Sequence, residues 1–198
     1  MDKIAEGAEA AVFVDDGRVV KLRHPKDYRI KEIDERLRKM RTRREAKVIE
    51  TLAKAGVAVP ELISSDDRKM EIIMGRVGGV KLKDVLSGTN CGNLCSLAGE
   101  KLAIIHNAGI IHGDFTTSNI LVDSGKIVVI DFGLSYFSDK AEDRAVDIHV
   151  FSQSLEIRSF AFHEKCVESL LKAYLAHAKN GNEVIARLRK VQSRGRNK

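Results

Sequence analysis

Two carboxylates and one amide stand close together in this sequence. Asp114 and Asn119 are five positions apart, and Asp131 follows a short apolar run and directly precedes Phe-Gly. Phosphoryl transfer from magnesium-bound ATP needs such a set: one acid orients the attacking oxygen and accepts its proton, while an amide and a second acid hold Mg²⁺. The complete set at this spacing therefore predicts a Mg-ATP site. His112, in the same loop, is interpreted as structural rather than as a base.

One lysine lies in an apolar stretch that has the pattern of a strand. Lys21 stands in Val-Val-Lys-Leu, and a strand lysine that points into a cleft can contact ATP phosphates when a helix carboxylate holds it. The helix expected next offers Glu45, which shares a face with Val48 and Ile49, three and four residues on. We therefore predict that Lys21 pairs with Glu45. Three other glutamates of this helix are interpreted as solvent-exposed: Glu32, Glu35 and Glu50.

A turn of small residues precedes that lysine. It contains Gly7, Ala8 and Glu9, and such a turn lets backbone N–H groups approach phosphates. With a single glycine it would be an ordinary turn if taken alone. Beside the other groups, it predicts a phosphate-binding segment.

The elements that must position these groups change character along the chain. Strands are expected at residues 10–14, 19–23, 62–64 and 69–74, with an Asp-Asp-Gly hairpin between the first two. A long helix is expected at 30–55, because apolar residues recur at helical spacing and Gly56 follows. The residues predicted to form its apolar face are Ile33, Leu37, Met40, Val48 and Leu52.

After Gly75, Gly78 and Gly79 the sequence becomes mostly helical. Helices are expected at 94–107, 142–158, 163–179 and 182–191, and a strand hairpin at 120–122 and 127–130. The predicted class is α+β, with an ATP cleft between two lobes. Its predicted parts are a β-rich N-lobe (1–74), a hinge (75–80), an α-helical C-lobe (81–190) and a basic tail (191–198).

Charge and composition limit the function classes. The net charge is +6, and six basic residues with no acid lie in the last twelve positions, so the remaining 28 basic residues balance the 28 acidic ones. A basic tail on a neutral body suggests either an anionic partner or a solubilising end. No stretch has the length of a membrane helix and no secretory signal is recognised, so we expect a cytoplasmic protein. The three cysteines have no metal-ligand spacing and are interpreted as structural or surface thiols.

The order of lysine, helix glutamate, His-x-Asp-x₄-Asn and Asp-Phe-Gly resembles that of the protein-kinase superfamily. Within it, the chain closely resembles the small kinase/ATPase subunit of the KEOPS complex, which makes threonylcarbamoyl-adenosine in tRNA. The resemblance covers essentially the whole chain. The block from Arg41 and Thr42 to Glu45 and Ala46 is the most specific stretch. The final Arg-Gly-Arg is similar to that family's basic tail.

This resemblance implies roles for the polar residues. Lys21 binds phosphates and pairs with Glu45, Asp114 is the catalytic acid, and Asn119 and Asp131 bind magnesium.

The resemblance also implies roles around these groups. The adenine would hydrogen-bond to the backbone of Gly75 and Val77, with Met74 behind it. Asp147 would brace the backbone of the loop that carries the catalytic acid. Gly75 stands where the family usually has an acid.

The chain also departs from typical protein kinases. Gly113 replaces the usual arginine before the catalytic Asp, and Thr116 replaces the usual lysine after it. Thirteen residues separate Gly133 from Asp147, with no Ala-Pro-Glu. This is too short for an activation segment with a peptide-binding platform.

We therefore expect an ATPase or restricted kinase that docks on the threonylcarbamoyl-transferase subunit and a small regulatory subunit, with the tail on tRNA or on the transferase. Three alternatives stay open. The chain could be an independent serine/threonine kinase that acts on itself, for example at Ser135 or Ser138, or on bound partners. It could be a small-molecule kinase, or a non-enzymatic tRNA-binding scaffold.

Overall fold

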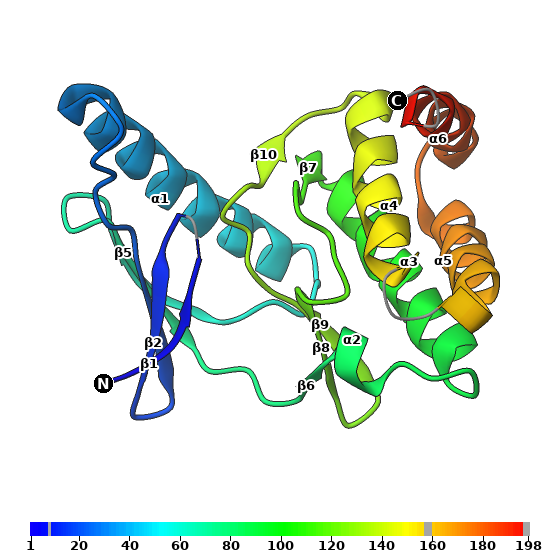
Figure 1. Cartoon of the computed structure of the whole chain (residues 1–198), viewed down its shortest axis with the longest axis horizontal. Coiled ribbons are helices and arrows are strands. Elements are labelled where there is room, and N and C mark those ends of the chain that lie inside the picture. The colour runs from blue at the N-terminus through cyan, green and yellow to red at the C-terminus, as the bar shows by residue number, and fades with distance from the viewer. Residues whose placement is uncertain (8, 157–159, 196–198) are drawn as a thin grey trace.

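The computed structural model describes residues 1–7, 9–156 and 160–195. The first part of the chain is an antiparallel sheet in the order β1-β2-β3-β5-β4 with one long helix (Figure 1). The β2–β3 hairpin turns at Asp16 and Gly17, whose φ angles are 41° and 72°, as the Asp-Asp-Gly signal predicts. The strands are β1 (Asp2–Glu6), β2 (Ala11–Asp15), β3 (Arg18–Leu22), β4 (Leu62–Asp66) and β5 (Glu71–Gly75). Strand β1 was not expected, because its residues do not alternate between apolar and polar side chains. In the structure all five are exposed.

Helix α1 (Lys31–Lys54) packs on this sheet through its second half only. Val48 and Leu52 are buried in the core, as predicted. The predicted apolar face is wrong for the first half, where Ile33 and Met40 are 52% and 42% exposed. The first turns of α1 extend past the ends of the strands in Figure 1, so this half has no sheet beneath it.

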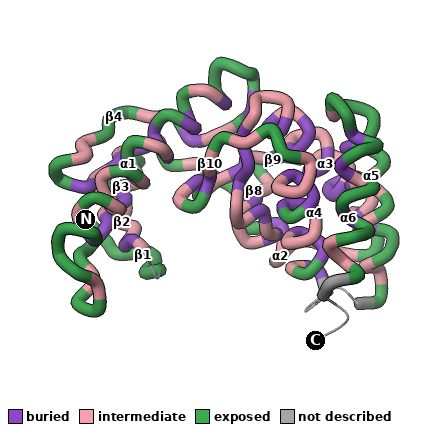
Figure 2. The backbone as a smooth tube through the Cα atoms, turned by 90° about the horizontal axis from the view of Figure 1, so that it is seen from above, coloured by how far each residue is buried: buried purple, intermediate pink, exposed green. Residues whose placement is uncertain are grey.

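The second part of the chain is built on the buried helix α3. Helix α5 packs closely along α3, since a Cβ on Gly99 would lie 2.2 Å from the carbonyl oxygen of Leu170. Figure 2 shows the buried segments on the inner sides of these helices. The thiols of the cysteines on α3 and α5 are free and buried, which excludes the surface alternative. The helices are α2 (Leu82–Val85), α3 (Cys91–Asn107), α4 (Ala141–Glu156), α5 (His163–His177) and α6 (Gly181–Gly195), with a 3₁₀ turn at Phe160–Phe162.

Short strands support the loops of this part. Strands β6 (Val80–Lys81), β8 (Ile120–Asp123) and β9 (Lys126–Val129) form one antiparallel sheet, and β7 (Ile110–Ile111) pairs with β10 (Tyr136–Phe137). The connection from β5 reaches β6 through Gly79, whose φ is 99° and whose Cβ would lie 2.5 Å from the Val122 carbonyl oxygen. A glycine is required there.

The last helix is longer than predicted. Helix α6 continues to Gly195, so residues 191–195 of the predicted tail are helical, and Val191 packs against the hydrophobic core. Residues 196–198 of that tail, and residues 157–158 of the helix expected at 142–158, lie outside the described residues. None of the described helices is long and apolar enough to cross a membrane.

Candidate active site

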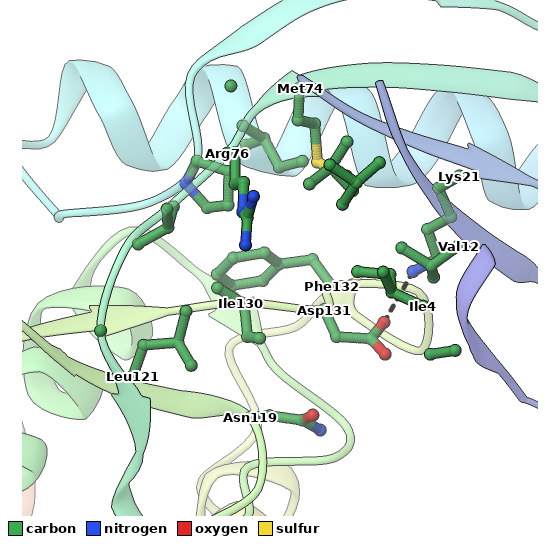
Figure 3. A pocket seen from close by; sticks show the side chains of 18 of the residues that line it. Ile4, Val12, Lys21, Met74, Arg76, Asn119, Leu121, Ile130, Asp131 and Phe132 are labelled. Carbon is green, nitrogen blue, oxygen red and sulfur yellow. Dashed lines mark hydrogen bonds and ion pairs between the residues drawn. The ribbon is translucent and has the colours of Figure 1, made fainter. Parts of the chain in front are cut away.

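A cavity of about 420 Å³ lies between the two parts of the chain. Figure 3 shows Val12, Met74, Leu121 and Ile130 around it, which come from the sheet and from the second part. Small-molecule sites have this size and this mixture of apolar walls with a few polar groups.

The predicted lysine–glutamate pair is present at the wall of this cavity. Lys21 is 6% exposed, and its Nζ donates to Oε1 of Glu45 and to Oδ1 of Asp131, both at 2.7 Å (the second contact is drawn in Figure 3). Of the rival glutamates, Glu35 pairs with Lys39 and the other two are exposed.

The electrostatics keep both partners of the second contact ionised. Burial raises the pKa of Asp131, but the Lys21 ammonium and the Gly133 N–H outweigh it and leave that pKa below its usual value. Burial lowers the pKa of Lys21, but Glu45 and Asp131 outweigh it and leave that pKa raised. Asp131 also has a φ of 62°, a conformation uncommon for a non-glycine residue and often found at functional sites.

A second buried cation contacts the same glutamate, and the sequence analysis missed it. Arg23 is 2% exposed, and its Nη2 donates to Oε2 of Glu45. Thus each carboxylate oxygen of Glu45 has its own cation. Arg23 stands two residues after Lys21, and side chains at that spacing in a strand point to the same face of the sheet. This spacing is the sequence signal that could have placed Arg23 near Lys21.

The predicted acid and amide are in direct contact. Nδ2 of Asn119 donates to the carbonyl oxygen of Asp114 at 2.9 Å and to its Oδ2 at 2.8 Å. These bonds leave the amide oxygen of Asn119 free to face the cavity, which this residue lines. Burial raises the pKa of Asp114 although the Asn119 amide acts in the opposite direction. A raised pKa improves a carboxylate as a proton acceptor.

Asp147 of α4 braces the loop, as the resemblance implied. Its Oδ2 accepts from the His112 N–H at 2.7 Å, and its Oδ1 accepts from the Gly113 N–H at 2.9 Å. Its Oδ2 also lies 3.2 Å from Nε2 of His106, whose Nδ1 is 2.8 Å from the Tyr174 hydroxyl. Burial lowers the pKa of His106, so the neutral ring donates to Asp147 and accepts from Tyr174. Nothing in the sequence pattern had singled out His106.

The loop histidine has a structural place, as expected. Nδ1 of His112 accepts from the Asp114 N–H at 3.3 Å, so its Nε2–H donates to the Ile130 carbonyl at 3.1 Å. Burial lowers the pKa of His112. The neighbouring Gly113 has a φ of 78°, and a Cβ there would lie 2.5 Å from the Leu134 carbonyl oxygen. This contact explains why no arginine stands at this position.

The predicted phosphate-binding turn is held by α1. Glu9 forms ion pairs with Arg29 (3.1 Å) and with Arg41 of α1. Burial raises the pKa of Glu9, but the two arginines outweigh it and lower the pKa. The Gly7 N–H donates to the Ala10 carbonyl at 2.9 Å, and Ala8 lies outside the described residues. Neither Gly7 nor Glu9 lines the cavity, so their contact with phosphates stays a prediction.

A hydrogen bond to the residue before β4 leaves fewer backbone groups for the predicted adenine contacts. Met74, Gly75 and Val77 all line the cavity. The Gly75 N–H already donates to the Glu61 carbonyl at 2.8 Å. Gly75 can therefore offer an adenine only its carbonyl oxygen.

The sequences of known proteins show which family this chain belongs to. A profile of the RIO domain matches residues 9–148. The chain is 40% identical over 194 residues to a probable serine/threonine-protein kinase BUD32 homolog of Archaeoglobus fulgidus, covering 98% of this chain and 95% of that protein. It is 35% identical over 211 residues to the KEOPS complex subunit Bud32 of Pyrococcus abyssi, covering 99% and 96%. The chain belongs to the Bud32 family of RIO-domain proteins.

Some Bud32-family relatives are longer. The chain is 41% identical to a probable bifunctional tRNA threonylcarbamoyladenosine biosynthesis protein of Methanothermobacter thermautotrophicus, covering 98% of this chain but 36% of that protein. It thus spans about a third of such a relative. Among solved structures, the Rio2 kinase–ADP/Mg²⁺–phosphoaspartate complex of Chaetomium thermophilum matches with a TM-score of 0.67 at 19% identity, over 96% of this chain and 70% of that one. At that identity the likeness shows a protein-kinase-like fold, and the class is α+β as predicted.

The donors of this Bud32-family chain fit a magnesium ion bound together with a nucleotide. The Asp131 carboxylate and the Asn119 amide line the same cavity. The described residues contain no group of three His, Cys, Asp or Glu side chains placed to hold a metal. Mg²⁺ usually takes one or two protein oxygens and completes its octahedron with water and substrate phosphates, which this pair matches.

Proposed function

We propose that this chain binds Mg-ATP in the cavity and transfers the γ-phosphoryl group, as the kinase/ATPase subunit of a KEOPS complex that modifies tRNA with threonylcarbamoyl-adenosine. The observation that carries the proposal is the chain of contacts from Glu45 through Lys21 to Asp131. These three side chains meet at the wall of the cavity, with 2.7 Å between Lys21 and each carboxylate. A structural ion pair would not need a second carboxylate that is half exposed.

Each polar residue then has a task. Lys21 contacts the phosphates and Glu45 fixes its direction. Asp114 accepts the proton of the attacking hydroxyl or water, whose oxygen bonds to the γ-phosphorus as the bond to the β-phosphate oxygen breaks and ADP leaves. Asn119 and Asp131 would hold Mg²⁺, which neutralises the phosphate charge when bound.

The acceptor is water or a hydroxyl of a bound partner. The serines near the site are poor acceptors, because Ser135 is buried and its Oγ donates to the Phe132 carbonyl at 2.5 Å. The Ser138 hydroxyl donates to Asp143 at 2.6 Å. These contacts disfavour self-phosphorylation at either serine and support an acceptor that is not part of this segment.

The partners follow from the family and from α6. We propose that the chain docks on the threonylcarbamoyl-transferase subunit and on a small regulatory subunit, and that its C-terminal basic residues contact tRNA. Helix α6 buries Val184 and Leu188, and it exposes Arg187, Arg189 and Lys190. Exposed cations on an anchored helix suit contact with phosphates, with an affinity that falls as salt rises.

The first test uses γ-labelled Mg-ATP with the purified chain, with and without the transferase subunit and tRNA. Free phosphate and protein-bound label are counted for wild type, Asp131→Ala and a matched control, Asp139→Ala, whose carboxylate is 94% exposed. We expect label release that rises with the partner and is lost only in Asp131→Ala. Equal release of free phosphate from wild type and Asp131→Ala would contradict phosphoryl transfer at this site and favour the non-enzymatic scaffold. Label on protein would show which chain is the acceptor.

The tRNA contact needs a separate test, because deletion from residue 191 would remove Val191 from the core. Neutralising Arg189 and Lys190 to glutamine leaves α6 packed. We expect weaker tRNA binding with a shallower salt dependence, and unchanged ATP affinity. An unchanged salt slope would contradict the role of α6.

A further inference from the structure

The guanidinium of Arg23 is buried beside the candidate active site. Arg23 follows β3 and is 2% exposed. Its N–H donates to the Met70 carbonyl at 3.1 Å, and its own carbonyl accepts from Nη1 of Arg38 at 3.4 Å. Its backbone is therefore fixed on both sides, and the side chain has one direction in which to extend.

The polar contacts of this guanidinium go to a single partner. Nη2 donates to Oε2 of Glu45, while Nε and Nη1 are buried with no hydrogen-bond partner in the described part of the chain. Burying a guanidinium is costly unless its donors are paired. An arginine kept only to tie elements together would use more of its five donors. We therefore attribute the burial of Arg23 to its contact with Glu45.

Four charges balance at this point, two positive and two negative. Lys21 bridges Glu45 and Asp131, and Arg23 contacts only Glu45. A Cβ on Gly133 would lie 3.1 Å from Nζ of Lys21 and 3.5 Å from Nη2 of Arg23, so both cations lie against the Asp-Phe-Gly turn. When phosphates and a cation enter the cavity, Lys21 and Asp131 acquire new partners. Glu45 then keeps Arg23 as the partner that does not move.

We propose that Arg23 is a positioning residue, which holds Glu45 by its second oxygen so that Glu45 keeps Lys21 directed at the phosphates. This proposal rests on the proposed Mg-ATP function. Arg23 does not line the cavity, so it acts through Glu45 rather than on the nucleotide.

The test compares Arg23→Met, Arg23→Lys and the control Arg43→Met, which removes an exposed cation of α1 whose ion pair is with Asp67. Thermal melts first select the folded variants. ATP turnover is then measured with KM separated from kcat. We expect kcat to fall roughly tenfold to a hundredfold in Arg23→Met, with KM within about threefold, since the group lost acts on the transition-state geometry. Arg23→Lys should recover part of the loss, and Arg43→Met should retain wild-type kcat.

A second readout does not need turnover. An acyl-phosphate derivative of ATP transfers its acyl group to a lysine amine that lies against the phosphates, and mass spectrometry measures the labelled fraction of Lys21. We expect strong labelling in wild type and about tenfold slower labelling in Arg23→Met. If Arg23→Met does not fold, the test uses Arg23→Lys alone. Slower labelling of Lys21 and a lower kcat than in wild type would then support the role of Arg23.

The outcomes separate the two proposals. Wild-type labelling of Lys21 with unchanged labelling and kcat in the Arg23 variants would overturn the role of Arg23 and leave the ATP site intact. No labelling of Lys21 in wild type would overturn the ATP site, and the role of Arg23 with it. A double variant of Arg23→Met with Glu45→Gln should be no slower than Glu45→Gln alone, because Arg23 acts through that glutamate. Additive losses would contradict this.

Discussion

Replacing Asp147 by asparagine removes one oxygen acceptor and one charge without changing the size of the side chain. In the structure, Oδ1 accepts from the Gly113 N–H at 2.9 Å, and Oδ2 accepts from the His112 N–H at 2.7 Å and from His106 Nε2 at 3.2 Å. An amide has a single oxygen, so its NH₂ group must face at least one of these donors. The best orientation keeps the amide oxygen at the Oδ2 position and leaves Gly113 without an acceptor.

The cost follows from that loss. A hydrogen bond to a charged group contributes about 1.5–3 kcal/mol, and a buried donor without a partner costs about 1–3 kcal/mol. We therefore expect Asp147→Asn to lower the free energy of unfolding by about 3 kcal/mol, which in a chain of this length lowers Tm by roughly 6–12 °C. Turnover should fall at least about tenfold at temperatures where the variant is folded, because the braced backbone carries Asp114.

The assay is urea unfolding followed by circular dichroism, with ATP turnover measured on the same samples. The matched control is Asp139→Asn, a carboxylate near the start of the same helix that is 94% exposed and pairs only with Arg144 among the described residues. It should stay within about 0.5 kcal/mol of wild type. If Asp147→Asn also stays within that margin, the brace does not act as described.

Three further predictions concern single features. Gly113→Ala should cost about 2 kcal/mol or more in unfolding free energy, whereas Gly125→Ala, with a similar φ and no atom within 4 Å of its Cβ, should cost about 1 kcal/mol; equal losses would contradict the clash. His106 and His112 have lowered pKa values because they are buried, so the unfolded chain binds protons first as pH falls below about 6.5. The free energy of unfolding from urea titrations at pH 7.5, 6.5 and 5.5 should therefore decline by up to about 1.4 kcal/mol per pH unit for each ring, and the urea midpoint should fall with it. A midpoint that rises toward acid would refute this. Val191→Asp should destabilise the fold by about 1–2 kcal/mol in the same assay, because the side chain packs on the core, and an unchanged midpoint would show that α6 ends earlier.

The polar groups that bind to one another were predictable because their chemistry restricts their partners. A buried lysine needs a carboxylate, and Glu45 was identified by the two buried residues that share its face. The place of Asp114 and Asn119 on one loop before a hairpin was predicted from their spacing, and the structure adds the direct contact between them. These inferences needed only local patterns and the pairing rules for charges.

Other features of the fold depend on which elements pack against a given helix or strand. A local sequence pattern does not contain this information. The exposed apolar residues in the first half of α1 have the same spacing as the buried ones in its second half, but the sheet ends between them. Strand β1 is a fully exposed edge. Arg23 ends the strand predicted at 19–23, and its spacing from Lys21 does not reveal that it is buried beside Glu45, which the structure shows. The extent of α6 was underestimated because residues 192–195 give no apolar pattern.

Two ion pairs connect α1 to the strands of the sheet: Arg41 pairs with Glu9, between β1 and β2, and Glu45 pairs with Lys21 of β3. Arg41 and Glu45 are one helical turn apart on α1, so these two contacts lie on the same side of the helix. A shift of α1 as a rigid rod would therefore move Glu9, which follows β1, together with Lys21 at the cavity wall. A protein bound to the free first half of that helix would change the geometry of the site from a distance, without entering the cavity.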